Sequence, residues 1–143
     1  MHELTIRAAA ASAALSRFRD RPLEWGRVDC VRSLAFTLRK LKRPVSLAKA
    51  GSYYSATGAL KALKRAGHDS LEAAIDAQGL VRISPAAARV ADVLAVPGDG
   101  VLSALWIVLG NGKALGWHED SELCSVIILQ PGAAIAAWST YRG

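Results

Sequence analysis

The residues of this 143-residue chain best suited to covalent chemistry are its two cysteines, Cys30 and Cys124. Cys30 follows Asp29 at the predicted start of a helix, where unpaired amides and the helix dipole stabilise a thiolate. Cys124 lies in the apolar run Leu123–Ile127 and is predicted to be a buried thiol that packs as a small hydrophobic residue. The spacing of the two cysteines gives no disulfide framework. Cys30 is therefore the candidate nucleophile.

A cysteine hydrolase also needs a general base within about 2.6–3.2 Å of the sulfur, usually a histidine that a third group orients. The chain contains three histidines. His2 lies near a chain end and His68 follows Gly67 in a predicted turn, so both are expected at the surface. His118 is the remaining candidate base. Its alternative role is that of a solvated histidine next to the acidic turn at 119–120.

The N-terminal two thirds of the chain must place Cys30, and its apolar residues recur at helical spacing. The pattern predicts helices over about 4–19, 29–44 and 58–66, a short helix that begins after Ser70, and a last turn over 84–89. Asp29 is well placed to cap the second helix, because its carboxylate can accept hydrogen bonds from the first free amides. Trp25 is expected to pack against the preceding connector and fix the angle at which the chain enters this helix.

After Val90 the pattern changes to short apolar or alternating segments typical of strands. The predicted strands are 92–96, 101–109, 113–117 and 124–129. Asn111 and Gly112 predict a two-residue hairpin turn, because both tolerate a positive φ. Helices followed by an antiparallel β-meander define a single α+β domain over 1–143. The sequence leaves open whether Trp106 and Trp117 are core residues, which it favours, or an exposed anchor at an interface.

The segment Trp25-Gly26-Arg27-Val28-Asp29-Cys30 resembles the Trp-Gly-x-x-Asp-Cys signature around the nucleophile of the papain-like NlpC-type cysteine peptidases. More particularly, the chain is similar to a phage and prophage branch of this superfamily that occurs among tail genes. Further matching segments follow in the same order: 51–54, 58–63, Gly67, 70–74, 91–93 and Trp138. The resemblance implies an NlpC-type fold, with Cys30 as nucleophile and with Trp25, Gly26 and Asp29 supporting it.

The same resemblance implies that the base is missing. The segment Ala104–Gly112 matches a family strand that begins with the base histidine, so Ala104 occupies the base position. The position of the base's polar partner falls near Gly116, which is equally inert. His118 lies two residues beyond Gly116 on the same strand face, a displacement of about 7 Å at ~3.4 Å per residue. Only a bulge or an unusual turn would bring it to Cys30.

The composition argues against several other functions. The net charge of +6 comes largely from cations near predicted helix ends, where the dipole favours them, and no nucleic-acid-reading motif accompanies it. No run of ~20 apolar residues predicts a membrane span. Cys30, Cys124 and His118 lack the ligand spacing of a zinc site, and 110–112 is a hairpin turn rather than a phosphate loop. We expect no metal and no cofactor.

The resemblance implies a structural or accessory protein of a phage or prophage tail, at the tail tip or baseplate, with a degenerate peptidoglycan-hydrolase-like domain. The expected partners are other tail proteins and cell-wall peptide, and the expected location is the virion after synthesis in the bacterial cytoplasm. The first alternative is an active cysteine peptidase or amidase that cleaves cell-wall peptides with Cys30 and a relocated base, His118. The second is a basic nucleic-acid binder, whose affinity would fall steeply with salt.

Overall fold

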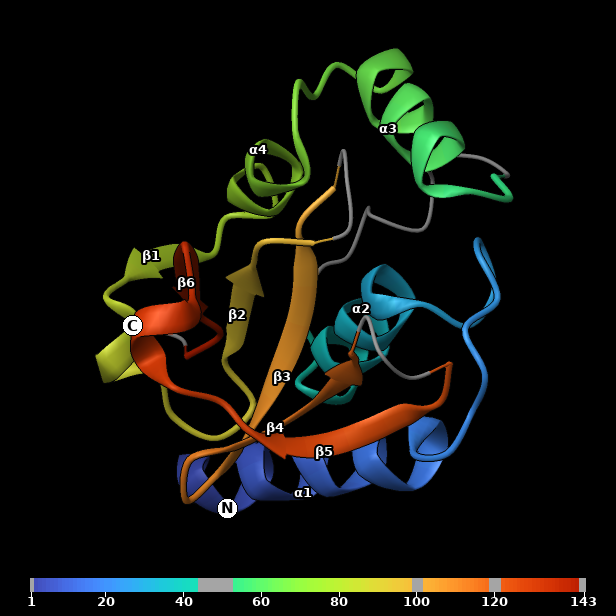
Figure 1. Cartoon of the computed structure of the whole chain (residues 1–143). Helices are drawn as coiled ribbons and strands as arrows, with labels where there is room; N and C mark the ends of the chain where they lie inside the picture. The colour runs from blue at the N-terminus through green and yellow to red at the C-terminus, as the bar shows by residue number, and fades with distance from the viewer. Residues whose placement is uncertain (1, 44–52, 99–101, 119–121, 142–143) are drawn as a thin grey trace.

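The computed structural model describes residues 2–43, 53–98, 102–118 and 122–141, and within them four α-helices accompany a six-stranded antiparallel sheet (Figure 1). The elements are, in chain order, α1 (Glu3–Phe18), α2 (Cys30–Lys40), α3 (Ala56–Arg65), α4 (Leu71–Asp76), β1 (Val81–Ile83), the 3-10 turn η2 (Pro85–Ala87), β2 (Val93–Val96), β3 (Ala104–Gly110), β4 (Lys113–Trp117), β5 (Cys124–Ile128), the 3-10 turn η3 (Pro131–Ala133) and β6 (Ala136–Ser139). The strand order is β1-β6-β2-β3-β4-β5. The predicted α+β class is confirmed.

The finer prediction of helices followed by a simple meander is not confirmed, because the sheet contains two strands that the sequence pattern did not predict. β1 is only three residues long, too short to show a period of two. β6 begins with two alanines, which have low strand propensity. It lies between β1 and β2, antiparallel to both. The strands β2, β3, β4 and β5 do lie side by side in chain order.

Local capping explains where the helices begin. The Asp29 carboxylate caps α2, as predicted, and Ser70 caps α4 by accepting the N–H of Ala73 at 3.0 Å. The predicted helix over 58–66 begins earlier, at Ala56, because the Ser55 hydroxyl accepts the N–H of Gly58. The second helix ends at Lys40 instead of at Pro44. Pro44 itself, like Val101 at the predicted start of β3, lies outside the described residues.

The hairpin between β3 and β4 has the predicted turn. Gly110 pairs with Lys113, so Asn111 and Gly112 form the two-residue loop between them. Their φ angles are 55° and 75°, the left-handed values that such a turn requires. The turn sets the register of β3 against β4 and thereby places Ala104 and Trp117 at the same end of the hairpin.

The core lies mainly between the sheet and the two long helices, α1 and α2, which pack on one face of it (Figure 1). Phe18 of α1 and Leu34 and Leu38 of α2 meet inward-facing strand residues such as Ile107. On the other face, Trp106 packs with a second set of buried residues: Leu94, Val108, Ala114 and Ala137. Trp106 is 2% exposed and Trp117 is 9% exposed, so both tryptophans are core residues.

Arg7 of α1 is fully buried and links this helix by hydrogen bonds to residues near the C-terminal end of the described chain. The Arg7 guanidinium donates to Asp92 Oδ1 at 2.8 Å and to Thr140 Oγ1, and its Nε donates to the Val90 carbonyl at 3.2 Å. The ring of Tyr141 lies over the guanidinium, 3.1 Å from Cζ to the ring centroid. Burial lowers the Arg7 pKa, and the charges of Asp92 and Tyr141 oppose that shift. The cluster closes α1 onto the sheet.

Candidate functional site

The Asp29 carboxylate is the centre of the polar network that holds the start of α2. It is 1% exposed. Oδ1 accepts the N–H of Arg32 at 2.9 Å, while Oδ2 accepts the N–H of Gly26 at 2.8 Å and the hydroxyl of Tyr53 at 3.0 Å. The carboxylate thus joins the connector, the helix start and the segment before α3. Its predicted role as the helix cap is confirmed.

Sequence reasoning missed Tyr53 as a member of this site. Its hydroxyl lies against a carboxylate 24 positions earlier in the chain, and neither periodicity nor spacing connects the two. Burial raises the pKa of the Tyr53 hydroxyl, with the Asp29 charge and their hydrogen bond as further causes. The hydroxyl therefore stays protonated and donates to Asp29. The one available signal was the match of 51–54 to the resembled branch.

Gly26 and Trp25 occupy tight positions beside this network. Gly26 has φ +81°, and a Cβ there would lie 2.6 Å from the carbonyl oxygen of Tyr53. Only glycine fits such a backbone without displacement. Trp25 packs against Tyr53 and Ala59, so its described contacts are with α3 and with the segment before it; its packing against the connector stays a prediction.

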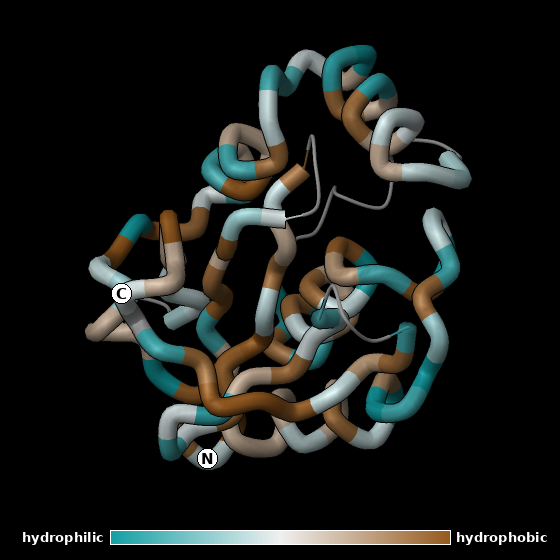
Figure 2. Tube along the Cα trace, viewed as in Figure 1, coloured by the Kyte–Doolittle hydropathy of each residue, from teal (hydrophilic) through white to brown (hydrophobic). Residues whose placement is uncertain are grey.

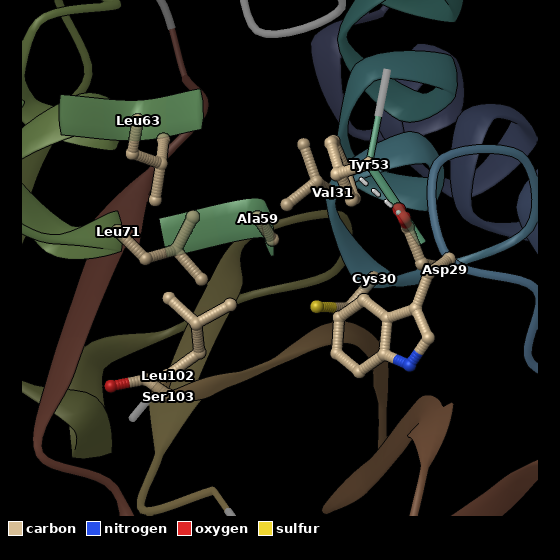
Figure 3. Close-up of a pocket in the computed structure, with 10 residues that line it drawn as sticks. Asp29, Cys30, Val31, Tyr53, Ala59, Leu63, Leu71, Leu102 and Ser103 are labelled. Atoms are coloured by element: carbon tan, nitrogen blue, oxygen red, sulfur yellow. Dashed lines mark hydrogen bonds between the residues drawn. The ribbon is translucent and has the colours of Figure 1, made fainter. Parts of the chain in front are cut away.

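The Cys30 thiol lies at the first residue of α2 and points into a small cavity of about 40 Å³ (Figure 3). Most of the lining is apolar, with Leu63, Leu71 and Leu102 around the sulfur side of the cavity. The Cys30 residue as a whole is partly exposed, but the apolar lining gives a thiolate little solvation.

Burial raises the pKa of Cys30 to about 12, and the charge of Asp29 adds to the shift. Hydrogen bonds from the backbone N–H of Leu105 and from the amides at the start of α2 lower the pKa, but they are outweighed. The helix start does favour a thiolate, as expected from the sequence. Desolvation and the neighbouring carboxylate have the larger effect, so the pKa is raised overall. A raised pKa makes a thiol a weaker nucleophile at neutral pH, because the thiolate is the reactive form.

Part of the predicted site lies around one open groove of about 1070 Å³. Cys30, Ala104 and His118 all line it, although 88 positions separate the first and last of them. Ala104 is the first residue of β3, beside the Leu105 amide that binds the sulfur. His118 directly follows β4. The structure thus brings Cys30, Ala104 and His118 to the same surface.

Gly116 lies under the indole of Trp106. A Cβ built on Gly116 would meet the Trp106 ring at 2.7 Å, so no larger residue fits without moving the ring. The resemblance places a polar partner for the base at Gly116, and the buried indole of Trp106 fills the space beside that position. Ala104 and Gly116 therefore supply neither a base nor a group to orient one.

This contact gives a first prediction. Replacing Gly116 with alanine should lower the free energy of unfolding by about 1–3 kcal/mol, because the added methyl group overpacks the Trp106 ring. Urea denaturation of the variant measures the loss. Gly132→Ala is the matched control, since a Cβ there meets nothing within 4 Å, and it should unfold like the wild type. An equal effect of both substitutions would contradict the tight contact.

The described part of the chain contains no group of three or more His, Cys, Asp or Glu side chains arranged to hold a metal ion. None of its helices has the length and apolar character needed to cross a membrane.

The comparisons with known proteins agree with this geometry. The crystal structure of the NlpC/p60 domain of the peptidoglycan hydrolase SagA is similar, with a TM-score of 0.55 at 20% sequence identity, over 92% of this chain and 97% of that one. The chain therefore has an NlpC/p60-like fold. A search of curated proteins gave no match. A family model described as a domain of unknown function, DUF6950, matches residues 3–140, and the chain accordingly belongs to the DUF6950 family.

Proposed function

We propose that this chain is a non-hydrolytic, NlpC-like structural or accessory component of a phage or prophage tail, at the tail tip or baseplate. It is made in the bacterial cytoplasm, becomes part of the virion and contacts other tail proteins and cell-wall peptide. The tail assignment rests on the resemblance of the Trp25–Cys30 signature and of the ordered segments that follow it. The proposed loss of hydrolysis rests on the methyl side chain of Ala104, which lines the same groove as Cys30 at the position where the resemblance expects the base, and the raised pKa of Cys30 supports it.

The raised pKa of Cys30 supports the absence of nucleophilic catalysis. A thiol whose pKa is about 12 has a thiolate fraction of only ~10⁻⁵ at pH 7, whereas an unperturbed cysteine has a few per cent. The thiolate fraction of Cys30 at pH 7 is therefore roughly a thousandfold lower than that of an unperturbed cysteine. In cysteine hydrolases an adjacent base removes this deficit, and Ala104 offers only a methyl group.

The thiol state is directly measurable, and this is a second prediction. In a Cys124→Ser variant, Cys30 should react with iodoacetamide at pH 7 about a thousandfold more slowly than a free cysteine. Because its pKa is raised to about 12, the rate should rise close to tenfold per pH unit as far as the fold survives. A plateau above pH 8 or 9 would show an ordinary thiol and contradict the proposal.

The second candidate function is an active cysteine peptidase or amidase for cell-wall peptides. The observation in its favour is that His118 lines the same groove as Cys30. It predicts rapid labelling of Cys30 that a His118→Ala substitution abolishes, together with release of peptide fragments from peptidoglycan. For the non-hydrolytic domain we expect the same slow labelling with and without His118, and no fragments from purified peptidoglycan by mass spectrometry.

The tail assignment has its own test. Phage particles induced from a strain that encodes the chain should contain it, and quantitative mass spectrometry of purified particles should find it with the tail after heads and tails are separated. Detection only in the soluble lysate, with none in purified tails, would refute a virion component. This result is independent of the thiol measurement, so each half of the proposal can fail separately.

A further inference from the structure

The positive charge of the chain is concentrated in one segment that includes α2 and α3. Residues 30–68 contain nine of the 18 Lys and Arg residues and none of the 12 Asp and Glu residues. The other nine cations lie in the same parts of the chain as all of the acidic residues. The helix dipole accounts for cations at a helix end, but it does not account for the lack of acidic residues between them.

The structure gathers part of this charge at the C-terminal end of α2. Arg39 and Lys40 lie in the last turn of the helix, and both are exposed. Arg43 follows the helix, and its Nη1 donates to the Thr140 carbonyl at 3.0 Å. This hydrogen bond ties the end of α2 to the residues that follow β6.

A cation from a distant part of the chain joins them. Arg89 lies between η2 and β2 and is exposed. Its guanidinium stacks on the ring of Tyr141, 3.4 Å from Cζ to the ring centroid. Arg43 and Arg89 thus contact two adjacent residues, although 46 positions separate the two arginines in the chain. We call Arg39, Lys40, Arg43 and Arg89 the α2-end cluster.

The α2-end cluster has no ion pair with any carboxylate of the described residues. The described partner of the Arg43 side chain is a neutral carbonyl. Asp92 accepts the backbone N–H of Arg89, but its carboxylate is fully buried and is paired with Arg7. The charge of the cluster is therefore available to an anionic partner.

The aromatic rings beside the cluster indicate which kind of anionic partner it fits. Lys40 lies over the ring of Phe36 at 5.3 Å, and Arg89 covers the ring of Tyr141. A single-stranded nucleic acid needs open ring faces on which its bases stack. Helices that read duplex DNA bring their N-terminal residues to the base edges, whereas this cluster lies at a helix C-terminus. Cations on flexible stems without a stacking surface suit anionic lipid headgroups, which bind clusters of about four to eight Lys and Arg residues.

We propose that the α2-end cluster binds the surface of a membrane that contains anionic lipids. The cations approach the headgroups, and no helix inserts into the bilayer. This interaction goes beyond the tail function proposed above and does not depend on it, because it is a property of the isolated chain.

The cations of α3 lie apart from this surface. The bond between Tyr53 and Asp29 holds the start of α3 at the opposite end of α2, which is about 16 Å long at ~1.5 Å per residue. This length exceeds the Debye length of about 8 Å at physiological ionic strength. Figure 2 shows hydrophilic residues along α3, and Lys61 and Lys64 are exposed. They therefore serve as a control with the same charge at another place.

Sedimentation with lipid vesicles over a series of salt concentrations tests the binding. The wild type should bind vesicles of phosphatidylglycerol and phosphatidylcholine, with an affinity that falls as salt is added, and it should not bind pure phosphatidylcholine. Replacing both Arg39 and Lys40 with glutamine should weaken binding about 25-fold, because each cation near an anionic membrane contributes about fivefold. The matched control replaces Lys61 and Lys64 with glutamine and should change the affinity by less than about twofold.

A single substitution tests whether the distant arginine belongs to the cluster. Arg89→Gln should weaken binding about fivefold, whereas Lys113→Gln, at an exposed position of β4, should leave it unchanged. Circular dichroism spectra establish that each variant is folded. The proposal is overturned by a wild type that ignores anionic vesicles, by equal weakening in the two double variants, or by an Arg89→Gln variant that binds like the wild type. Tighter binding to a DNA duplex than to the vesicles overturns it as well.

Discussion

Arg7→Ala is expected to lower the free energy of unfolding by about 3–5 kcal/mol, the usual cost of removing one partner of a buried ion pair. Arg7 and Asp92 are both fully buried. The substitution leaves the Asp92 carboxylate without its cation, although the backbone N–H groups of Arg89 and Thr140 still donate to it at 2.8 Å. It also removes the guanidinium under the ring of Tyr141. Guanidinium chloride denaturation followed by circular dichroism measures the change.

Arg27→Ala is the matched control for this experiment. Arg27 lies 3.8 Å from Glu24, but its side chain is 79% exposed, and solvent-exposed pairs of this kind contribute little to stability. We expect its denaturation curve to superimpose on that of the wild type. Asp92→Asn should cost less in the Arg7→Ala background than in the wild type, because the two groups stabilise each other. If the losses of stability in Arg7→Ala and Asp92→Asn simply add in the double variant, Arg7 and Asp92 are not energetically coupled.

Gly26→Ala should have the second-largest effect, with a loss of about 2–4 kcal/mol from left-handed strain and overpacking together. The φ of +81° disfavours any L residue, and the new Cβ would lie 2.6 Å from the backbone oxygen of Tyr53. Because that atom belongs to the main chain, it can move away only with the segment before α3. The movement would break the Tyr53–Asp29 hydrogen bond. Thermal and urea unfolding both report the loss.

Gly67→Ala separates the two contributions. Gly67 also has a positive φ, +94°, but a Cβ there meets nothing within 4 Å. Its substitution should therefore cost only the strain of a left-handed alanine, about 1–2 kcal/mol. The excess loss in Gly26→Ala measures the clash with Tyr53. If the two variants lose the same stability, the close approach between Gly26 and Tyr53 contributes nothing.

Much of the α+β domain could be predicted from the sequence because its signals are local. Helical periodicity and capping residues such as Asp29 and Ser70 act within one turn of a helix, and both caps are present. The turn at Asn111 depends on two adjacent residues, and it too is present. In the described part of the chain, the strands β1 and β6 and the short turn η3 were not predicted. The resemblance around Cys30 led to the NlpC/p60-like fold, which the similar crystal structure supports.

The candidate site could be predicted only in part. The sequence indicated Cys30 as the nucleophile position and Ala104 as a position without a base, and the structure places both at one groove. The sequence could not give the balance of burial, charge and amide hydrogen bonds that raises the pKa of Cys30 to about 12. Nor could it show that the indole of Trp106 lies on Gly116. These quantities depend on neighbours far away in the chain.

The sequence by itself determined which residue types are available: one cysteine at a helix start, no histidine at the head of the facing strand, and the local signals that begin and end most elements. Tertiary structure alone decided what those residues can do. Tyr53 reaches Asp29 across 24 positions and Arg7 reaches Thr140 across 133. The physical reason is that solvation, charge and packing depend on distance in space, whereas periodicity and capping depend on distance along the chain.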